Sequence, residues 1–145
     1  MGVDFGFQNQ MMRMIDDFGI KEKVQVITNP SRDDVIAAYG ESEFLVLPSR
    51  WELSPLTPLE GFAFKKPVVS TNVHGIPSIV TNGQNGILVK NEDFHELAEA
   101  IMELINDKQK CLEYGLSGYN LVKTECNSKS MAEKTLRMYN QIINR

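Results

Sequence analysis

The sequence has few of the residues that bind metals or cross-link small folds, with only two cysteines and two histidines. Cys111 and Cys126 form no CxxC pair, and His74 and His95 are equally isolated. A structural zinc site needs three or four ligands at short spacings, so we expect no metal site. A disulfide-stapled miniprotein is excluded by the same shortage of cysteine.

Long apolar runs and an excess of basic charge are also missing. No run of about 18 apolar residues occurs, and the start of the chain lacks the charged-then-apolar order of a signal peptide, so we expect a cytoplasmic protein. There are 15 Lys and Arg against 19 Asp and Glu, a formal net charge of -4. This balance gives no basic field to attract nucleic acid, and we expect no such partner.

The composition is typical of one folded domain. The chain has 145 residues, of which 42% are hydrophobic and 23% charged. A domain of this length buries about 68% of its unfolded surface, enough for a core without disulfides. Because no repeat, low-complexity tract or linker interrupts the chain, we predict a single domain over residues 1–145.

Two kinds of apolar pattern alternate along the first two thirds of the chain. Short β-rich runs occur at residues 24–27, 44–47 and 67–70, and the run at 44–47 is apolar on both faces, as in parallel strands covered by helices. Between them, helical spacing is shown by Met11, Met14, Ile15, Phe18, Val35, Ile36, Tyr39, Leu59, Phe62 and Ala63. The alternation predicts an α/β fold, a Rossmann-like doubly wound parallel sheet flanked by helices.

The pattern changes after Asn91 to a helical C-terminal tail. Three stripes of helical period cover residues 94–105, 114–121 and 131–143. Asp93 precedes the first stripe, where a carboxylate suits the helix dipole. Gly115 and Gly118 interrupt the second stripe. Upstream of this tail, Gly83 and Gly86 are interpreted as turn glycines.

Candidate chemistry follows the predicted strand at 44–47, because open α/β sheets bind ligands at the carboxyl ends of their strands. The composition of residues 48–60 predicts a loop leading into a helix. Thr57 as N-cap, with Pro58 and Glu60, fits a capping box, which gives Glu60 a structural explanation. Glu52, taken alone, also has a structural explanation, as a charged side chain exposed to solvent.

Two sets of spaced residues, one containing both glutamates and one following them, occur in order along the chain. They are Ser49-x-x-Glu52-x-x-x-Leu56-x-x-Leu59-Glu60-Gly61-x-Ala63-x-x-Lys66-Pro67-Val68-Val69-x-Thr71 and Gly75-Ile76-Pro77-x-x-Val80-x-x-Gly83-x-x-Gly86-x-Leu88-Val89. From about Gly6 to its C-terminus the chain resembles the donor-binding domain of retaining glycosyltransferases of the GT-B fold (glycosyl transferases group 1, family 4-like). The resemblance implies half of a GT-B fold, binding a nucleotide-diphosphate sugar and no metal or other cofactor.

The resemblance also implies a role for each residue of the loop. Glu52 takes the place of the catalytic glutamate that contacts the donor sugar hydroxyls, and Glu60 that of the carboxylate that binds the ribose. A carboxylate is an acceptor-only group suited to paired hydroxyls. The amides implied to face the diphosphate belong to Leu53, Ser54, Leu56 and Thr57. The family's Gly-aromatic-Gly stretch is replaced here by Leu53-Ser54-Pro55, and Pro55 removes one N–H.

Two further segments match donor-binding positions of the family. Thr28 and Asn29 match the loop that reads the base edge, although a turn and N-cap before a helix near Arg32 explains them equally well. Gly75 is expected to supply a conformation or a close approach that a side chain would prevent.

The opening Met1-Gly2-Val3-Asp4-Phe5-Gly6 lacks the hydrophobic first strand of a doubly wound sheet. We expect a domain truncated at its N-terminus, whose parent transfers the sugar to a hydroxyl acceptor with retention. The family's acceptor-binding domain and its Arg and Lys pair, which stabilise the leaving diphosphate, lie upstream. The chain alone is therefore expected to be inactive. Peripheral membrane association of the parent, and self-association of the chain through an exposed edge, are compatible with this interpretation.

Two alternatives stay open from the residues alone. A non-catalytic α/β nucleotide-binding or regulatory module, such as a receiver-like domain, needs an acidic cluster at a strand end, whereas Asp16-Asp17 and Asp33-Asp34 lie in helical stretches. An epimerase or phosphorylase of related fold needs a Gly-rich dinucleotide turn or a cofactor lysine, and the sequence contains no GxGxxG. A reading frame that continues upstream into a second Rossmann-like domain would favour the transferase.

Overall fold

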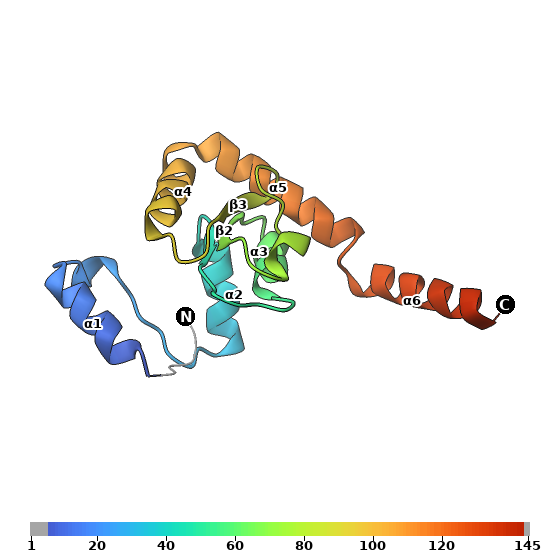
Figure 1. The fold of residues 1–145 in the computed structure, drawn as a ribbon, viewed down its shortest axis with the longest axis horizontal. Coiled ribbons are helices and arrows are strands. Elements are labelled where there is room, and N and C mark those ends of the chain that lie inside the picture. The colour runs from blue at the N-terminus through green and yellow to red at the C-terminus, as the bar shows by residue number, and fades with distance from the viewer. Residues whose placement is uncertain (1–5, 144–145) are drawn as a thin grey trace. The chain divides into compact units, whose positions relative to one another are not determined.

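The computed structural model describes residues 6–143, so the opening residues 1–5 lie outside the described part. Two units divide the chain, an N-terminal unit (residues 1–41) and a C-terminal unit (residues 42–145). The elements in chain order are α1 (Gln8–Asp17), η1 (Lys21–Lys23), α2 (Arg32–Glu41), β1 (Leu45–Leu47), α3 (Thr57–Ala63), β2 (Val68–Thr71), η2 (Ile76–Ser78), β3 (Gly86–Val89), α4 (Phe94–Asn106), α5 (Lys108–Thr124) and α6 (Ser128–Ile143) (Figure 1).

The N-terminal unit contains both helices predicted for it, α1 and α2. The strand predicted at 24–27 is wrong, because these residues form no strand of the described structure. Val24 does adopt extended dihedral angles (φ -124°, ψ 119°), as its β-branched side chain favours. A strand also needs a ladder of hydrogen bonds to a neighbour, which local propensity does not provide.

The C-terminal unit is built on a parallel three-stranded sheet in the order β1-β2-β3. Val68 of β2 stands opposite Leu45 of β1 and Gly86 of β3. Strands β1 and β2 confirm the runs predicted at 44–47 and 67–70. Strand β3 was missed: Gly86, interpreted as a turn glycine, is its first residue.

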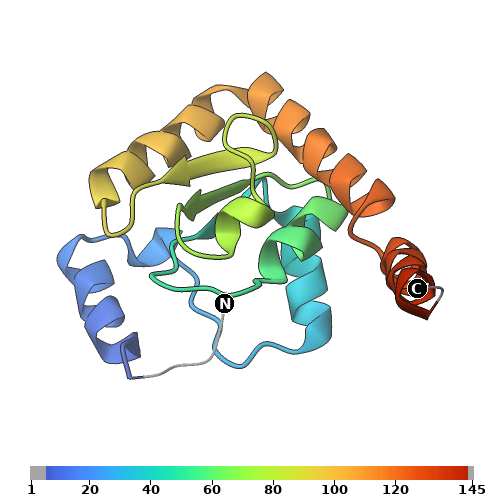
Figure 2. The same cartoon turned by 45° about the vertical axis from the view of Figure 1, so that its right-hand side comes forward.

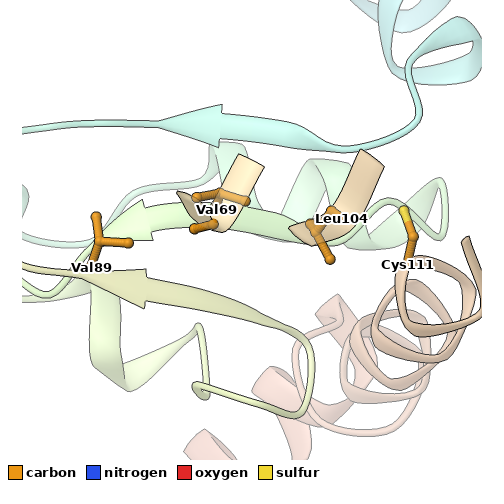
Figure 3. Packing of buried hydrophobic residues seen from close by; sticks show 5 residues of the cluster. Val69, Val89, Leu104 and Cys111 are labelled. Carbon is orange, nitrogen blue, oxygen red and sulfur yellow. The ribbon is translucent and has the colours of Figure 1, made fainter. Parts of the chain in front are cut away.

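Each face of the sheet carries its own hydrophobic cluster, because successive strand residues point to opposite sides. Val69 packs with Val89, Ala100, Leu104 and Cys111, which joins the sheet to α4 and α5 (Figure 3). On the opposite face, Val68 packs with Phe62, Ile76 and Val80, which belong to α3, η2 and the residues after it. In Figure 2, strands β2 and β3 lie between α4 and α3. Helices on both faces of a parallel sheet confirm the predicted Rossmann-like α/β fold.

Helix α5 is continuous, although the sequence suggested an interruption at its two glycines. Both glycines are buried contact points. A Cβ at position 115 would overlap the carbonyl oxygen of Lys65, and one at position 118 would overlap the ring of Phe62. The glycines therefore cost local helix propensity but allow α5 to lie directly on α3 and on the residues after it.

Substituting Gly118 by Ala is expected to destabilise the C-terminal unit. The added methyl overlaps the fully buried Phe62, and overpacking of a core costs about 1–3 kcal/mol. Urea unfolding followed by circular dichroism measures the change. Asn120→Ala, at an exposed position of the same helix, is the matched control and should change the free energy of unfolding by about 0.5 kcal/mol or less. Equal stabilities of Gly118→Ala and the control would contradict the packing.

The two cysteines differ in accessibility. Cys111 is 7% exposed, its thiol donates a hydrogen bond to the carbonyl oxygen of Glu43 (3.5 Å), and burial raises its pKa. Cys126 is exposed. Ellman's reagent at pH 8 should therefore modify one thiol rapidly and the other only after unfolding, because the thiolate is the reactive form. Two thiols reacting at equal rates in the native protein would contradict the buried position of Cys111.

Helix α6 confirms the third predicted stripe. The carboxamide oxygen of Asn127 accepts a hydrogen bond from the Ser130 amide (2.9 Å) and so caps its start. Its large apolar side chains are exposed, at Met131, Leu136, Met138, Tyr139, Ile142 and Ile143. Within residues 6–143, no helix is both long and apolar enough to cross a membrane.

Candidate functional site

The candidate site is the loop between β1 and α3, at the carboxyl end of β1. Two buried prolines, Pro55 and Pro58, anchor it to the unit. Around these anchors, Trp51, Leu53 and Leu56 are 59%, 72% and 67% exposed. Pro55, the residue of the Leu53-Ser54-Pro55 stretch that has no N–H, is buried, whereas its neighbours Ser54 and Leu56 are exposed.

Glu52 is half-buried and is held at its side chain and at its backbone. The Ser49 hydroxyl donates a hydrogen bond to Oε1 (3.0 Å), and the Gly75 amide donates one to the Glu52 carbonyl oxygen (2.9 Å). The part of the chain that the structure describes provides no cation paired with Glu52 and no hydrogen bond to Oε2. Arg50, two residues away, instead forms an exposed ion pair with Glu92 (3.0 Å).

Gly75 lies in the turn after β2 and packs against the loop after β1. Its φ of -78° is ordinary, so the glycine is required for close approach: a Cβ there would overlap the carbonyl oxygen of Leu53. This confirms that a side chain at position 75 is prevented. Next to it, the ring of His74 lies 5.9 Å from that of Trp51, measured between centroids. The turn after β2 thus supports the loop after β1.

Glu60 lies in α3, and the predicted capping box around it is wrong. The N-cap is Leu56, which already has helical dihedral angles (φ -82°, ψ -24°) and no side-chain cap. Thr57 therefore lies inside the helix and cannot act as the N-cap. The Glu60 amide donates to the Leu56 carbonyl oxygen (2.9 Å), and the residue is half-buried. The helix turns Pro58, Gly61 and Phe62 toward the core.

The amides expected to face a diphosphate have no protein partner. Within the described residues, the backbone N–H groups of Leu53, Ser54, Leu56 and Thr57 form no hydrogen bond. Unpaired amides are usually satisfied by water or by a ligand.

Thr28 and Asn29 belong to the N-terminal unit and precede α2. Asn29 has a left-handed backbone (φ 51°). Ser31 and Asp34 form a reciprocal box, because the Asp34 amide donates to the Ser31 hydroxyl (3.2 Å) and the Ser31 amide donates to the Asp34 carboxylate (2.9 Å). The hydrogen bond from the Ser31 side chain lowers the pKa of Asp34. The N-cap interpretation of this loop is confirmed, and its role toward a base stays a prediction.

A shallow hollow of about 280 Å³ lies at the carboxyl ends of the strands. Its walls include Pro48, Arg50 and Thr71, with Lys90 and Phe94 on the α4 side. Binding pockets for small molecules are typically about 300–1,000 Å³, so this hollow alone is too small for a nucleotide sugar. In residues 6–143, no group of three or more His, Cys, Asp or Glu residues is arranged to hold a metal ion.

Sequence reasoning missed two contributors to the geometry around Glu52. Ser49 appeared only as a matching residue of the first set of spaced residues, and Thr71 was noted in the same way. The spacing Ser-x-x-Glu was the available signal for Ser49, because a serine hydroxyl can donate to a carboxylate three residues along the chain. No local signal identifies Thr71, which donates a hydrogen bond to the Ser49 carbonyl oxygen from another strand.

Comparison with known proteins places the chain in a family. The family model described as glycosyl transferases group 1 matches residues 4–121. Sucrose-phosphate synthase from Thermosynechococcus elongatus has a TM-score of 0.85 at 22% identity, over 99% of this chain and 37% of that one. Anabaena HepE, solved in complex with UDP, has a TM-score of 0.85 at 21% identity, over 97% and 39%. The fold is therefore that of the Rossmann-like domain of GT-B glycosyltransferases.

The chain belongs to the glycosyl transferases group 1 family. It is 32% identical over 128 residues to an uncharacterized glycosyltransferase of Methanocaldococcus jannaschii, an alignment covering 83% of this chain and 36% of that protein. The chain thus spans between 36% and 39% of the length of these three relatives.

Proposed function

We propose that this chain binds the nucleotide-diphosphate sugar of a retaining glycosyltransferase. The observation that carries the proposal is the arrangement after β1, where two half-buried glutamates, Glu52 and Glu60, flank four amides without protein partners. The family of the chain supports a sugar-transferring parent, and the UDP bound to the structurally similar HepE supports a nucleotide ligand.

Each group suits a different part of such a donor. Oε2 of Glu52 is an acceptor available to the sugar hydroxyls, while the Glu60 carboxylate can accept from the two ribose hydroxyls. The unpaired amides of the loop are donors for the diphosphate oxygens. Thr28 and Asn29 are proposed to read the base, and Gly75 keeps the turn after β2 against the loop.

Charge limits what the described residues do for the reaction. The two charged side chains proposed to contact the donor, Glu52 and Glu60, are both acidic. Arg50, the cation of the loop, is engaged with Glu92. As the anomeric C–O bond breaks, negative charge grows on the leaving diphosphate, and cations stabilise such charge. We therefore propose that the remainder of the parent supplies the cationic side chains that stabilise the leaving diphosphate and binds the hydroxyl acceptor. The chain by itself then binds the donor weakly without transferring the sugar.

Calorimetric titration with UDP-, GDP- and ADP-glucose tests this function. We expect one of the three to bind the 145-residue chain weakly and the parent enzyme more tightly, with the same base preferred by both. Because the proposed base contacts lie in this chain, a different preference in the parent would contradict them. Absence of binding by any nucleotide sugar, in chain and parent alike, would overturn the proposal and favour a module with another ligand.

A further inference from the structure

Glu52 lies at the end of a short relay of two hydroxyl groups that starts in the sheet. Thr71 donates a hydrogen bond to the Ser49 carbonyl oxygen, and the Ser49 hydroxyl donates one to Oε1 of Glu52. We propose that Ser49 and Thr71 are positioning residues that hold the Glu52 carboxylate for the donor sugar. This inference rests on the proposed function and adds two residues that act through Glu52.

The relay starts from a fixed point. Thr71 is the last residue of β2 and is 4% exposed. Its neighbour Ser70 is fully buried and donates a hydrogen bond to the Leu47 carbonyl oxygen (2.7 Å). Two consecutive hydroxyls of β2 therefore bind the backbone where β1 ends. This attachment sets where the loop leaves the sheet, so Ser49 begins from a defined position.

Ser49 transmits that position to the carboxylate. A hydroxyl has a single hydrogen, and that of Ser49 is directed at Oε1. The remaining lone pairs of Oε1 and all those of Oε2 are available to hydroxyls of a ligand. The Gly75 amide holds the Glu52 carbonyl oxygen (2.9 Å), so the residue is restrained at its backbone as well as at its side chain.

The hydrogen-bond partner of the Glu52 carboxylate is a neutral hydroxyl and not a cation. Arg50 lies close in sequence but pairs with Glu92 (3.0 Å). Ser49 restrains Glu52 without cancelling its negative charge, which stays available to strengthen hydrogen bonds from sugar hydroxyls. Restraint of a contacting group by a supporting hydrogen bond is what an accurate binding site requires.

The test compares a ligand whose sugar is proposed to contact Glu52 with one that lacks that sugar. UDP-glucose and UDP, or the corresponding pair for the base that binds, are titrated into the chain and into Ser49→Ala. We expect Ser49→Ala to weaken binding of the nucleotide sugar about tenfold, as for loss of one supporting hydrogen bond, and to leave the affinity for the bare diphosphate within twofold. A purely structural role of Ser49 would weaken both ligands alike.

Conservative variants and a control complete the experiment. Ser49→Thr and Thr71→Ser keep the hydroxyl and should bind within threefold of the unmodified chain, whereas Thr71→Val should behave as Ser49→Ala. Thr124→Val removes a comparable hydroxyl hydrogen bond, to the Asn120 carbonyl oxygen (2.8 Å), away from the loop, and should alter neither affinity. If the unmodified chain binds the sugar nucleotide and Ser49→Ala matches it, the relay is wrong while the proposed function stands. No binding by the unmodified chain and parent overturns both.

Discussion

Replacing Glu52 by Gln should lower sugar transfer by the parent enzyme by about 10²- to 10³-fold, the usual effect of removing one preorganised electrostatic contact at a reacting centre. Gln keeps the length of the side chain but has neutral groups and one acceptor oxygen, so it no longer attracts the hydroxyls of the sugar as a carboxylate does. Steady-state kinetics with the preferred nucleotide sugar measure the loss as a decrease in kcat/KM.

The control for this variant is Glu113→Gln. Glu113 is an exposed carboxylate of α5 that accepts a hydrogen bond from the Gln109 side chain (2.8 Å), so its substitution removes the same charge outside the site. We expect the control to retain full transfer. If Glu52→Gln retains full transfer too, Glu52 does not contact the reacting sugar, and its hydrogen bond with Ser49 only stabilises the loop between β1 and α3.

Replacing Glu60 by Gln should weaken binding of the donor by about 10- to 100-fold. A carboxylate that accepts from both ribose hydroxyls makes charged hydrogen bonds, each worth about 1.5–3 kcal/mol, and Gln keeps only part of this interaction. Because the ribose belongs to the nucleotide, the bare nucleoside diphosphate should lose affinity by a similar factor. Titration of the chain with UDP and UDP-glucose, or the pair for the preferred base, measures both.

The two substitutions should therefore differ in which ligand they weaken. Glu52→Gln is expected to weaken only the nucleotide sugar, whereas Glu60→Gln weakens sugar nucleotide and bare diphosphate together. The opposite pattern, with Glu52→Gln weakening the bare diphosphate and Glu60→Gln sparing it, would exchange the roles of the two residues. Glu103→Gln, in α4, is a matched control because its carboxylate binds Lys110 (2.8 Å) on the surface of the unit.

The fold was predictable where the local pattern and the tertiary environment agree. The apolar run of β1 and the stripe of α4, with Asp93 accepting a hydrogen bond from the Glu96 amide (3.0 Å), are such cases. Strand β3 was missed because it begins with Gly86, a residue unfavourable in strands that here pairs directly with β2. The glycines of α5 lower helix propensity, and only the packing of α5 on α3 and its adjoining residues explains their presence.

Helix capping is another feature that the local sequence pattern predicts in one case and not in another. The motif Ser31-x-x-Asp34 forms a reciprocal box, whereas the similar motif Thr57-x-x-Glu60 does not. The difference is one residue in the start of α3, since Leu56 is already helical and leaves Thr57 inside the helix. Boundaries of this kind depend on how the preceding loop is anchored, here by the buried Pro55, which the motif alone does not report.

The two carboxylates of the candidate site could be predicted from the sequence, whereas the hydrogen bonds that support Glu52 could not. Glu52 and Glu60 stand out through the order of residues around them. Thr71 lies 22 residues from Ser49 in the sequence, and their hydrogen bond exists because adjacent parallel strands end side by side. Such contacts follow from register, which sequence patterns did not define here.

The central claim is that the loop between β1 and α3 holds the diphosphate and sugar of a nucleotide donor. The most direct test is a two-dimensional ¹H–¹⁵N NMR titration of the 145-residue chain with UDP-, GDP- and ADP-glucose. With one of these ligands, we predict saturable shifts concentrated at the amides of Leu53, Ser54, Leu56 and Thr57, with a further change at Gly75. Saturable shifts that leave these five amides unmoved, or no shifts with any of the three donors, would contradict the claim.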